Sequence, residues 1–187
     1  MIARGCEKLA LQTAALRGNP EVLNDLCALV DGLLVHASPE VEDYTEAKHE
    51  TSMASSGGAR MDGAEAALNL CRIDSRTAER FAPALERLSR DPHPEVRLAI
   101  AHALALLRNT APEAMWRIAA IYARDEPNRR VLRFFADFLS RVIHTDPPRV
   151  EELVLAILPR AQSNRDKPGQ ELMEVFGSLI IRLSVSH

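Results

Sequence analysis

The residue types that most often perform chemistry are scattered along this chain without the spacing that a site requires. Six histidines occur, and no two form the His-x-x-x-His or His-Glu-x-x-His pattern that places metal ligands on one helical face. No Gly-x-Ser-x-Gly turn, Walker loop or dinucleotide fingerprint occurs, because Ser55-Ser-Gly-Gly58 is too short and no Lys follows it. We therefore predict no catalytic, cofactor-binding or metal-binding residues, and no cofactor.

The cysteines likewise indicate packing. Cys6, Cys27 and Cys71 are odd in number and form no Cys-x-x-Cys pair, which disfavours a disulfide framework and a structural zinc site. We interpret Cys27 and Cys71 as small core residues. His102 falls on the polar flank of an Ala/Leu-rich segment, which favours a surface or groove position.

A basic sector suggests a second kind of chemistry, the binding of an anion. On a helix over 128–144, Arg129, Arg130, Arg133 and Arg141 share one sector with Asp137, opposite the apolar side chains. Such a sector is commonly a solvated face with i, i+4 pairs, here Arg133 with Asp137. The alternative is an acidic peptide or a nucleic-acid backbone.

The most informative stretch stops one helix and starts another. It reads Asp91-Pro92-His93-Pro94-Glu95-Val96-Arg97 and continues with Leu98-Ala-Ile-Ala-His-Ala-Leu-Ala-Leu-Leu107. The two prolines suit a turn and a first helical position, and Asp91 is predicted to cap the amides that follow. After Val96 the apolar residues recur every three or four positions, which predicts one buried stripe.

This stretch resembles the start of a HEAT repeat, whose pattern is Asp-x-x-Pro-x-Val-Arg followed by alternating Ala and Leu. The matching residues are Asp91, Pro94, Val96 and Arg97. The resemblance implies an all-α fold, an α-α superhelix (a solenoid of the ARM/HEAT type) built from antiparallel hairpins. It also implies that Arg97 bridges adjacent repeats.

Similar turns recur along the chain. One such turn is Asn19-Pro20-Glu21-Val22, in which Pro20 lies 74 residues before Pro94, or about two repeat lengths. Another is Asp125-Glu126-Pro127, after which Val131 lies 35 residues beyond Val96. Both distances give a repeat period in the mid-thirties, which is shorter than the roughly 40–47 residues of long HEAT units and closer to the roughly 34 residues of tetratricopeptides. The tetratricopeptide signature is missing, so short HEAT-like repeats are favoured.

Periodicity predicts about nine helices and no strand. Short connections between them favour antiparallel neighbours. Pro83 is expected to bend or split its helix. The predicted helices span 3–17, 20–36, 61–73, 76–89, 94–107, 112–124, 128–144, 147–161 and 169–185.

The segment at about 37–60 interrupts this pattern. It is acidic and then rich in small residues, with almost nothing to bury, so we predict a flexible insertion within a single domain spanning 1–187. The alternative is a docking or autoinhibitory segment in which Tyr44 and the acidic residues meet a basic surface. At the other end, the apolar stripe of 172–183 predicts that flanking repeats of a longer array, or another subunit, cover the last helix.

Composition limits the setting and the partner. The chain has 187 residues, 47% hydrophobic and 4% aromatic, which suits thin aliphatic helices in one domain. It has no apolar run of about 18 residues and no signal-peptide core, so we expect a cytoplasmic protein that does not insert into a membrane. A net charge of −3 with one Trp and two Tyr does not favour nucleic acid as the partner.

The resemblance implies a non-catalytic scaffold that binds a protein or peptide. An accessory subunit or domain of an enzyme is the alternative, because bilin lyases and alkylpurine DNA glycosylases use similar repeats. In HEAT-like stacks the second helix of each hairpin commonly lines the binding face, here 76–89, 112–124 and 147–161. The polar faces of these helices offer the predicted partner-binding residues, namely Trp116, Arg117, Arg124, Arg80, Arg87, Glu151 and Glu152. Trp116 is either an anchor for the partner or a half-buried packing residue between repeats.

Overall fold

The fold is all-helical in the computed structural model, which describes residues 2–40, 58–162 and 167–185. These ranges contain ten α-helices, one 3₁₀ helix and no strand. The α-helices are α1 (Ile2–Ala10), α2 (Thr13–Arg17), α3 (Pro20–Leu34), α5 (Ala59–Leu70), α6 (Ser75–Leu88), α7 (Pro94–Ala103), α8 (Pro112–Asp125), α9 (Arg129–Val142), α10 (Pro147–Gln162) and α11 (Lys167–Val185). The 3₁₀ helix η2 (Leu104–Leu107) continues α7.

Helix starts follow from local turn chemistry. Side chains of Asn19, Asp74 and Asn128 accept hydrogen bonds from the first free amides of α3, α6 and α9. Proline occupies the first position of α3, α7, α8 and α10, where its missing N–H costs nothing. The chain is therefore divided into short helices by its own sequence.

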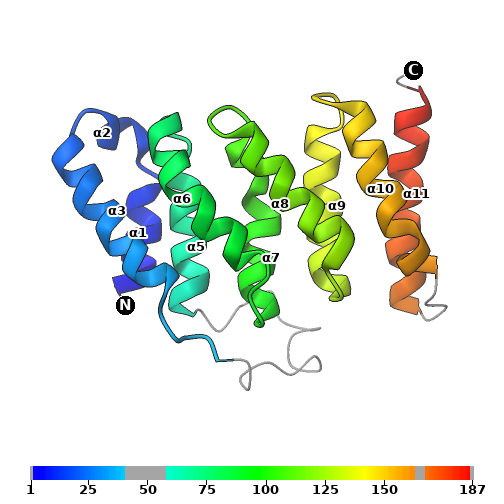
Figure 1. Ribbon diagram of the computed structural model, residues 1–187, viewed down its shortest axis with the longest axis horizontal. Helices are drawn as coiled ribbons and strands as arrows, with labels where there is room; N and C mark the ends of the chain where they lie inside the picture. Colours follow the sequence, from blue (N-terminus) through cyan, green and yellow to red (C-terminus); the bar gives the residue numbers. More distant parts are fainter. Residues whose placement is uncertain (1, 41–57, 163–166, 186–187) are drawn as a thin grey trace.

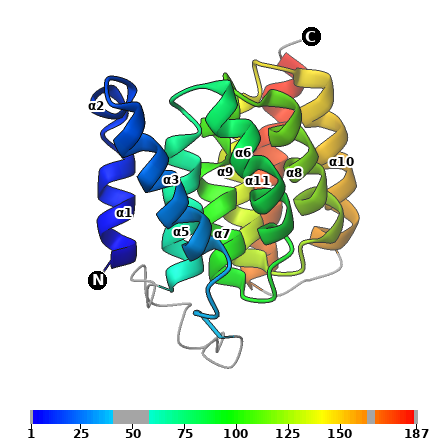
Figure 2. The ribbon, with the colours of Figure 1, turned by 60° about the vertical axis from the view of Figure 1, so that its left-hand side comes forward.

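The helices pack in two rows (Figures 1 and 2). The first row is α1, α5, α7, α9 and α11, in which each helix contacts the next. The second row is α3, α6, α8 and α10, which also contact in that order. Successive helices along the chain alternate between the rows from α5 to α11, so the apolar core lies between them.

The core is mostly aliphatic, with a small aromatic group near its middle. Phe135 stacks on Phe138 with ring centroids 5.5 Å apart, and Tyr122 packs against Phe135 at the same distance. Near the start of the rows the packing depends on a glycine. A Cβ at Gly63 of α5 would lie 2.8 Å from the Cβ of Leu33, so only glycine allows α3 to approach α5 this closely.

Several boundaries differ from the sequence prediction. The helix predicted over 3–17 is two helices, because Gln12 leaves the helical conformation and its amide bonds to Leu9 instead of continuing the helix. This break raises the number of α-helices from about nine to ten. Pro83 does not split α6: its side of the helix is exposed, so water can satisfy the carbonyl it leaves free. The helix predicted over 94–107 tightens into η2 at Leu104.

The match between Pro20 and Pro94 does not mark equivalent helices. Pro20 begins α3 in the second row, whereas Pro94 begins α7 in the first row. Both prolines reflect the same rule for starting a helix, which applies in either row. The regular spacing lies elsewhere, because the first-row helices α5, α7 and α9 begin at Ala59, Pro94 and Arg129, each 35 residues after the last.

The predicted insertion at about 37–60 extends too far at its C-terminal end. Residues 59 and 60 already belong to α5, and Arg60 lies among packed helices. Residues 41–57, which include Tyr44, lie outside the described residues, so the flexible-loop and docking interpretations both stay predictions.

Candidate functional site

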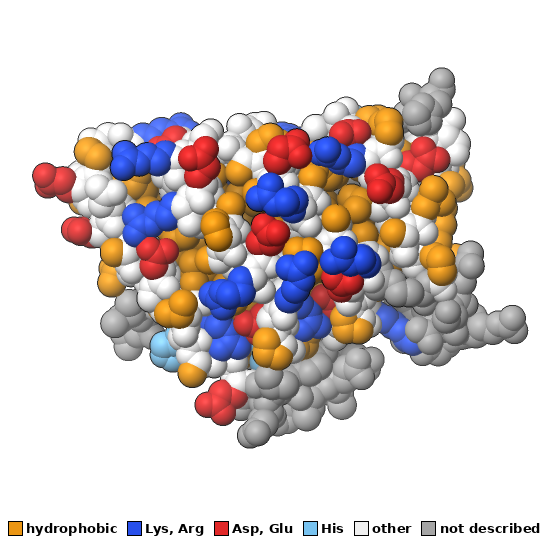
Figure 3. All heavy atoms as spheres, in the orientation of Figure 1, with side chains coloured by type: hydrophobic (Ala, Val, Ile, Leu, Met, Phe, Trp, Pro, Cys, Tyr) orange, Lys and Arg blue, Asp and Glu red, His pale blue; other side chains and the backbone are white. Residues whose placement is uncertain are grey.

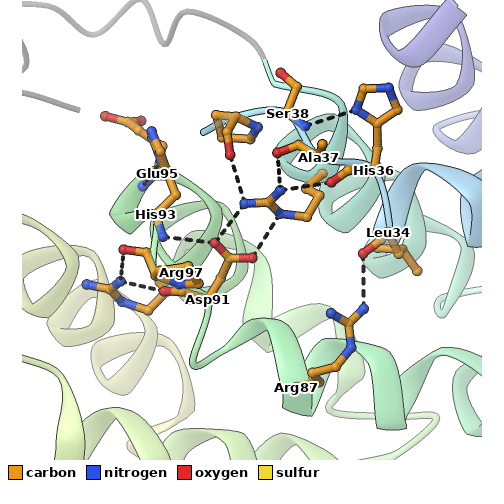
Figure 4. Close-up of polar contacts among 12 residues, drawn as sticks. Leu34, His36, Ala37, Ser38, Arg87, Asp91, His93, Glu95 and Arg97 are labelled. Atoms are coloured by element: carbon orange, nitrogen blue, oxygen red, sulfur yellow. Dashed lines mark hydrogen bonds and ion pairs between the residues drawn. The ribbon is translucent and has the colours of Figure 1, made fainter. Parts of the chain in front are cut away.

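Asp91, the first residue of the stretch that resembles the start of a HEAT repeat, forms a buried ion pair with Arg60. Figure 4 labels Asp91, and dashed lines mark its polar contacts. Arg60 Nε donates to Asp91 Oδ2 at 2.9 Å and Nη2 donates to Oδ1 at 3.1 Å. The same guanidinium donates to the carbonyl oxygens of His36, Ala37 and Pro39. Arg60 therefore links the chain after α3, the start of α5 and the turn before α7.

This ion pair changes how α7 is capped. Asp91 accepts from the amide of His93 at 2.9 Å, and His93 Nδ1 accepts from the amide of Glu95 at 3.2 Å. The cap of α7 is thus His93, and the prediction that Asp91 caps the helix directly is wrong. The carboxylate of Asp91 is engaged by Arg60 instead, since a guanidinium bonds it at two points.

Arg97 on α7, the next first-row helix, forms an ion pair like that of Arg60, here with Glu126 just after α8. Its Nε and Nη2 donate to the two carboxylate oxygens of Glu126 at 2.7 and 2.9 Å, and its Nη1 donates to the Asp91 carbonyl at 2.6 Å. Burial lowers the pKa of the Arg97 guanidinium, but the bonds to Glu126, together with the charges of Glu126, Tyr122 and Asp91, outweigh it, so the pKa lies above its ordinary value. Tyr122 donates its hydroxyl to the Arg97 carbonyl at 2.8 Å.

A third pair completes the series. Arg130 Nη1 lies 2.8 Å from Glu95 Oε1, joining the start of α9 to the start of α7. Arg60, Glu95 and Arg130 are each the second residue of a first-row helix, 35 residues apart. We call Arg60, Asp91, Glu95, Arg97, Glu126 and Arg130 the ion-pair ladder. Every member has its charge paired within the fold, so the ladder links helices and leaves little charge for a ligand.

The exposed side of the second row carries most of the predicted partner-binding residues. Arg80 on α6 pairs with Asp31 on α3 at 2.6 Å, and Arg117 on α8 pairs with Glu86 on α6 at 3.3 Å. Arg87 donates to the Leu34 carbonyl at the end of α3. Arginines of α6 and α8 thus bind the preceding second-row helix, α3 or α6, and also form part of the exposed surface of the second row.

The remaining predicted residues extend this surface. Arg124 pairs with its neighbour Asp125 at 2.8 Å, and both are exposed. Glu151 and Glu152 are exposed on α10. We call the exposed surface of α6, α8 and α10 the second-row face. Figure 3 shows basic and acidic side chains interleaved over the second row, so the charges do not form a single-sign patch.

Trp116 lies mostly inside the fold. Only 8% of its surface is exposed, its ring meets Phe138 edge-on at 6.3 Å, and the guanidinium of Arg149 lies over it at 5.5 Å. Of the two interpretations of this residue, the structure fits packing between helices. Partner binding by Trp116 stays a prediction, although the side chain offers a partner little surface.

The arginines of α9 do not act together. Arg130 belongs to the ion-pair ladder, and Arg141 donates to the His102 carbonyl at 3.2 Å. Arg133 and Asp137 are exposed, as the sequence predicted for a solvated sector. His102 is exposed and meets Phe134 edge-on at 5.6 Å.

A shallow hollow of about 310 Å³ borders the ladder between the α6–α7 turn and the end of α8. Tyr122, Arg97 and Glu126 line it, with Arg90 and Asp125 also contributing. Burial, and then the charge of Glu126, raise the pKa of Tyr122 well above its ordinary value. A tyrosine in that state keeps its proton at neutral pH, and Arg97 and Glu126 are already bonded to each other.

The described residues contain no group of three or more His, Cys, Asp and Glu side chains placed to hold a metal ion. All three cysteines are buried as free thiols. Burial, followed by the nearby Cys27, raises the pKa of Cys71 to about 12, which makes it a poor nucleophile. Within these same ranges no helix combines the length and apolarity needed to cross a membrane.

One carboxylate has a pKa near neutrality. Burial, and then the charges of Glu7 on α1 and Asp62 on α5, raise the pKa of Glu65 to about 7. Asp62 is itself buried, and desolvation raises its pKa, while Arg4 opposes the rise. The contact between α1 and α5 thus contains three acidic side chains.

Sequence reasoning missed Arg60, a member of the ion-pair ladder, and the role of His93 as the cap of α7. The 35-residue spacing from Glu95 back to Arg60 was the signal that could have found the first of them. Comparison of the chain with known protein families, curated proteins and solved structures gives no match.

Proposed function

We propose that this protein is a short HEAT-like solenoid that binds a protein or peptide partner on its second-row face and catalyses no reaction. The observation that carries this proposal is the regular register of the first row. Arg60, Glu95 and Arg130 occupy the same position of successive helices, and each forms an ion pair that joins its helix to a neighbouring element. Equal helical units that contact their neighbours are the hallmark of repeat proteins.

The second-row face supports the nature of the partner. Its arginines alternate with acidic side chains, and two of them already pair with acids of neighbouring helices. A polyphosphate backbone is bound by cations that are free to neutralise phosphates, so this surface suits a mixed-charge peptide or protein better. With Trp116 buried, Arg117 and Arg124, together with Glu151 and Glu152, are the side chains we expect the partner to meet.

The experiment is affinity capture from the native source, with the captured protein then produced and its binding measured by calorimetry. Replacing Arg117 and Arg124 by Ala should weaken binding at least about tenfold, because exposed arginines at an interface centre commonly contribute that much. The matched control replaces Arg133 and Arg141, which lie on the first-row helix α9. Loss of binding in the control with normal binding in the Arg117/Arg124 variant would place the partner on the other face. Co-purified nucleic acid with a steep salt dependence would favour the accessory-subunit alternative.

A further inference from the structure

The N-terminal end of the two rows, formed by α1 and α3, exposes an unusual amount of apolar surface. Leu9 and Leu11 at the end of α1 and just beyond it are 51% and 53% exposed, and Val22 and Leu29 of α3 are 47% and 55% exposed. On α3, these two are seven residues apart and so lie on one side of the helix. Single exposed leucines are ordinary, but three exposed apolar side chains on two contacting helices, with Leu11 in the turn after α1, give this end an apolar surface suited to a partner.

The charges at this end are sorted by helix. The fully exposed charges of α1 are Arg4 and Lys8, both positive, while Glu7 of the same helix is only partly exposed and its charge acts on Glu65 of α5. Those on the outer side of α3 are Glu21 and Asp25, and α3 contains no Lys or Arg. Among the described residues, no ion pair or side-chain hydrogen bond engages Lys8, Glu21 or Asp25, whereas the charge of Arg4 acts on Asp62 of α5. Inside the stack, by contrast, neighbouring second-row helices join through pairs such as Asp31 with Arg80 and Glu86 with Arg117.

We propose that the N-terminal end is a self-association surface, on which α1 of one molecule packs against α3 of a second copy across a two-fold axis. A two-fold contact repeats each pairing twice, so a basic α1 meets an acidic α3 in both directions. The apolar side chains of each helix would lie between the charges and lose their contact with water. This surface is complementary to itself, and that is why the occupant is the same chain and not an unrelated protein.

The proposal is independent of the second-row face. The dimer surface uses α1 and the outer side of α3, whereas Arg117, Arg124, Glu151 and Glu152 lie on α8 and α10. The two-fold arrangement also closes on itself, so it predicts a dimer and no larger assembly. A head-to-tail contact between the two ends of the stack would instead grow without limit.

The test is a charge exchange read by sedimentation equilibrium. Wild-type protein should be a dimer, while Lys8→Glu and Asp25→Lys should each self-associate at least about tenfold more weakly, because like charges then face each other in both contacts. Mixing the two variants should restore a dimer that contains one copy of each. In that mixed dimer the introduced carboxylate of one copy meets the introduced ammonium of the other, and the unchanged Lys8 and Asp25 meet in the second contact. Both contacts are then favourable again.

Matched controls use exposed charges elsewhere. Arg76→Glu and Glu79→Lys on α6 should remain dimeric, and circular dichroism should show unchanged helicity in all four variants. A wild-type monomer at every concentration, or assembly that grows steadily with concentration, would overturn the proposal. So would dimerisation of the Lys8 and Asp25 variants at wild-type strength, or failure of their mixture to recover the dimer.

Discussion

Arg60 and Asp91 are 31 residues apart in sequence and meet in a two-point ion pair with only 12% and 5% of their side chains exposed. The pair joins α5 to the turn before α7, and the three backbone carbonyls that Arg60 also holds attach the chain after α3 to the same point. One guanidinium thus organises three segments. Because the pair is buried, removal of either partner would leave an unpaired buried charge, which is strongly destabilising.

Arg60→Ala should therefore be among the most damaging single substitutions in this protein. It leaves Asp91 buried without its counter-ion and removes the donors to three carbonyls, so we expect a loss of about 3–5 kcal/mol in the free energy of unfolding. Urea denaturation followed by circular dichroism measures it. Arg76→Ala, an exposed arginine of α6, should change stability by less than about 0.5 kcal/mol. Equal effects of the two would show that the ion pair contributes nothing.

Leu104→Ala tests the packing between the rows. Leu104 is fully buried at the start of η2, so the substitution should create a cavity and cost about 2–5 kcal/mol. Since helices contact mainly their neighbours, hydrogen exchange should speed up first in α6 to α9 and later in α1 and α3. A loss under about 1 kcal/mol, or equal loosening everywhere, would contradict this register.

The all-helical fold was predictable because its determinants are local. Proline at the first helical position and side-chain caps at Asn19, Asp74 and Asn128 mark the helix starts in the sequence itself. Long-range contacts were not predictable in the same way. The sequence around α7 predicts Asp91 as its cap, but Arg60 binds the Asp91 carboxylate, and His93 caps the helix instead. Arg60 itself follows a Ser/Gly-rich stretch, so its neighbours in the sequence predict a loop and not a helix start.

Trp116 shows where helical periodicity fails. The apolar stripe of α8 passes through Met115, Ile118, Ala119 and Tyr122, which leaves Trp116 on its flank. A second-row helix, however, packs both against the first row and against its neighbour in the same row, so its buried surface is wider than one stripe. The flank facing α9 and α10 is therefore buried, and the tryptophan fills it.

Trp116→Ala should accordingly lower stability, and Arg117→Ala should not. The tryptophan is buried against Phe138 and Arg149, so truncation should cost about 3–5 kcal/mol. Arg117 is exposed and its pair with Glu86 is open to solvent, so its loss should cost no more than about 1 kcal/mol. Thermal and urea unfolding of the two single variants measure this difference. If Trp116→Ala were as stable as wild type, packing would not be the role of Trp116, and the interpretation as a partner-binding anchor would be favoured again.

The pKa of Glu65 predicts a pH dependence of stability. In the unfolded chain this carboxyl titrates near its ordinary value of 4.5, whereas in the folded protein burial, Glu7 and Asp62 raise its pKa to about 7. Between these values the folded state holds a proton that the unfolded state has released, so stability falls as the pH rises through this range. Above about pH 7 the loss is complete, because Glu65 is then charged in both states.

Glu65→Gln removes this ionisation and should flatten the profile. At about pH 8 the variant should be more stable than wild type by about 1–2 kcal/mol, a value reduced for the part of the side chain that water still reaches. At about pH 4 the two should be nearly equal, since Glu65 is then protonated and uncharged in wild type. Urea unfolding across this range measures both curves, with Glu79→Gln on the exposed side of α6 as the control. Parallel curves for wild type and Glu65→Gln would mean that Glu65 is not the group that responds to pH.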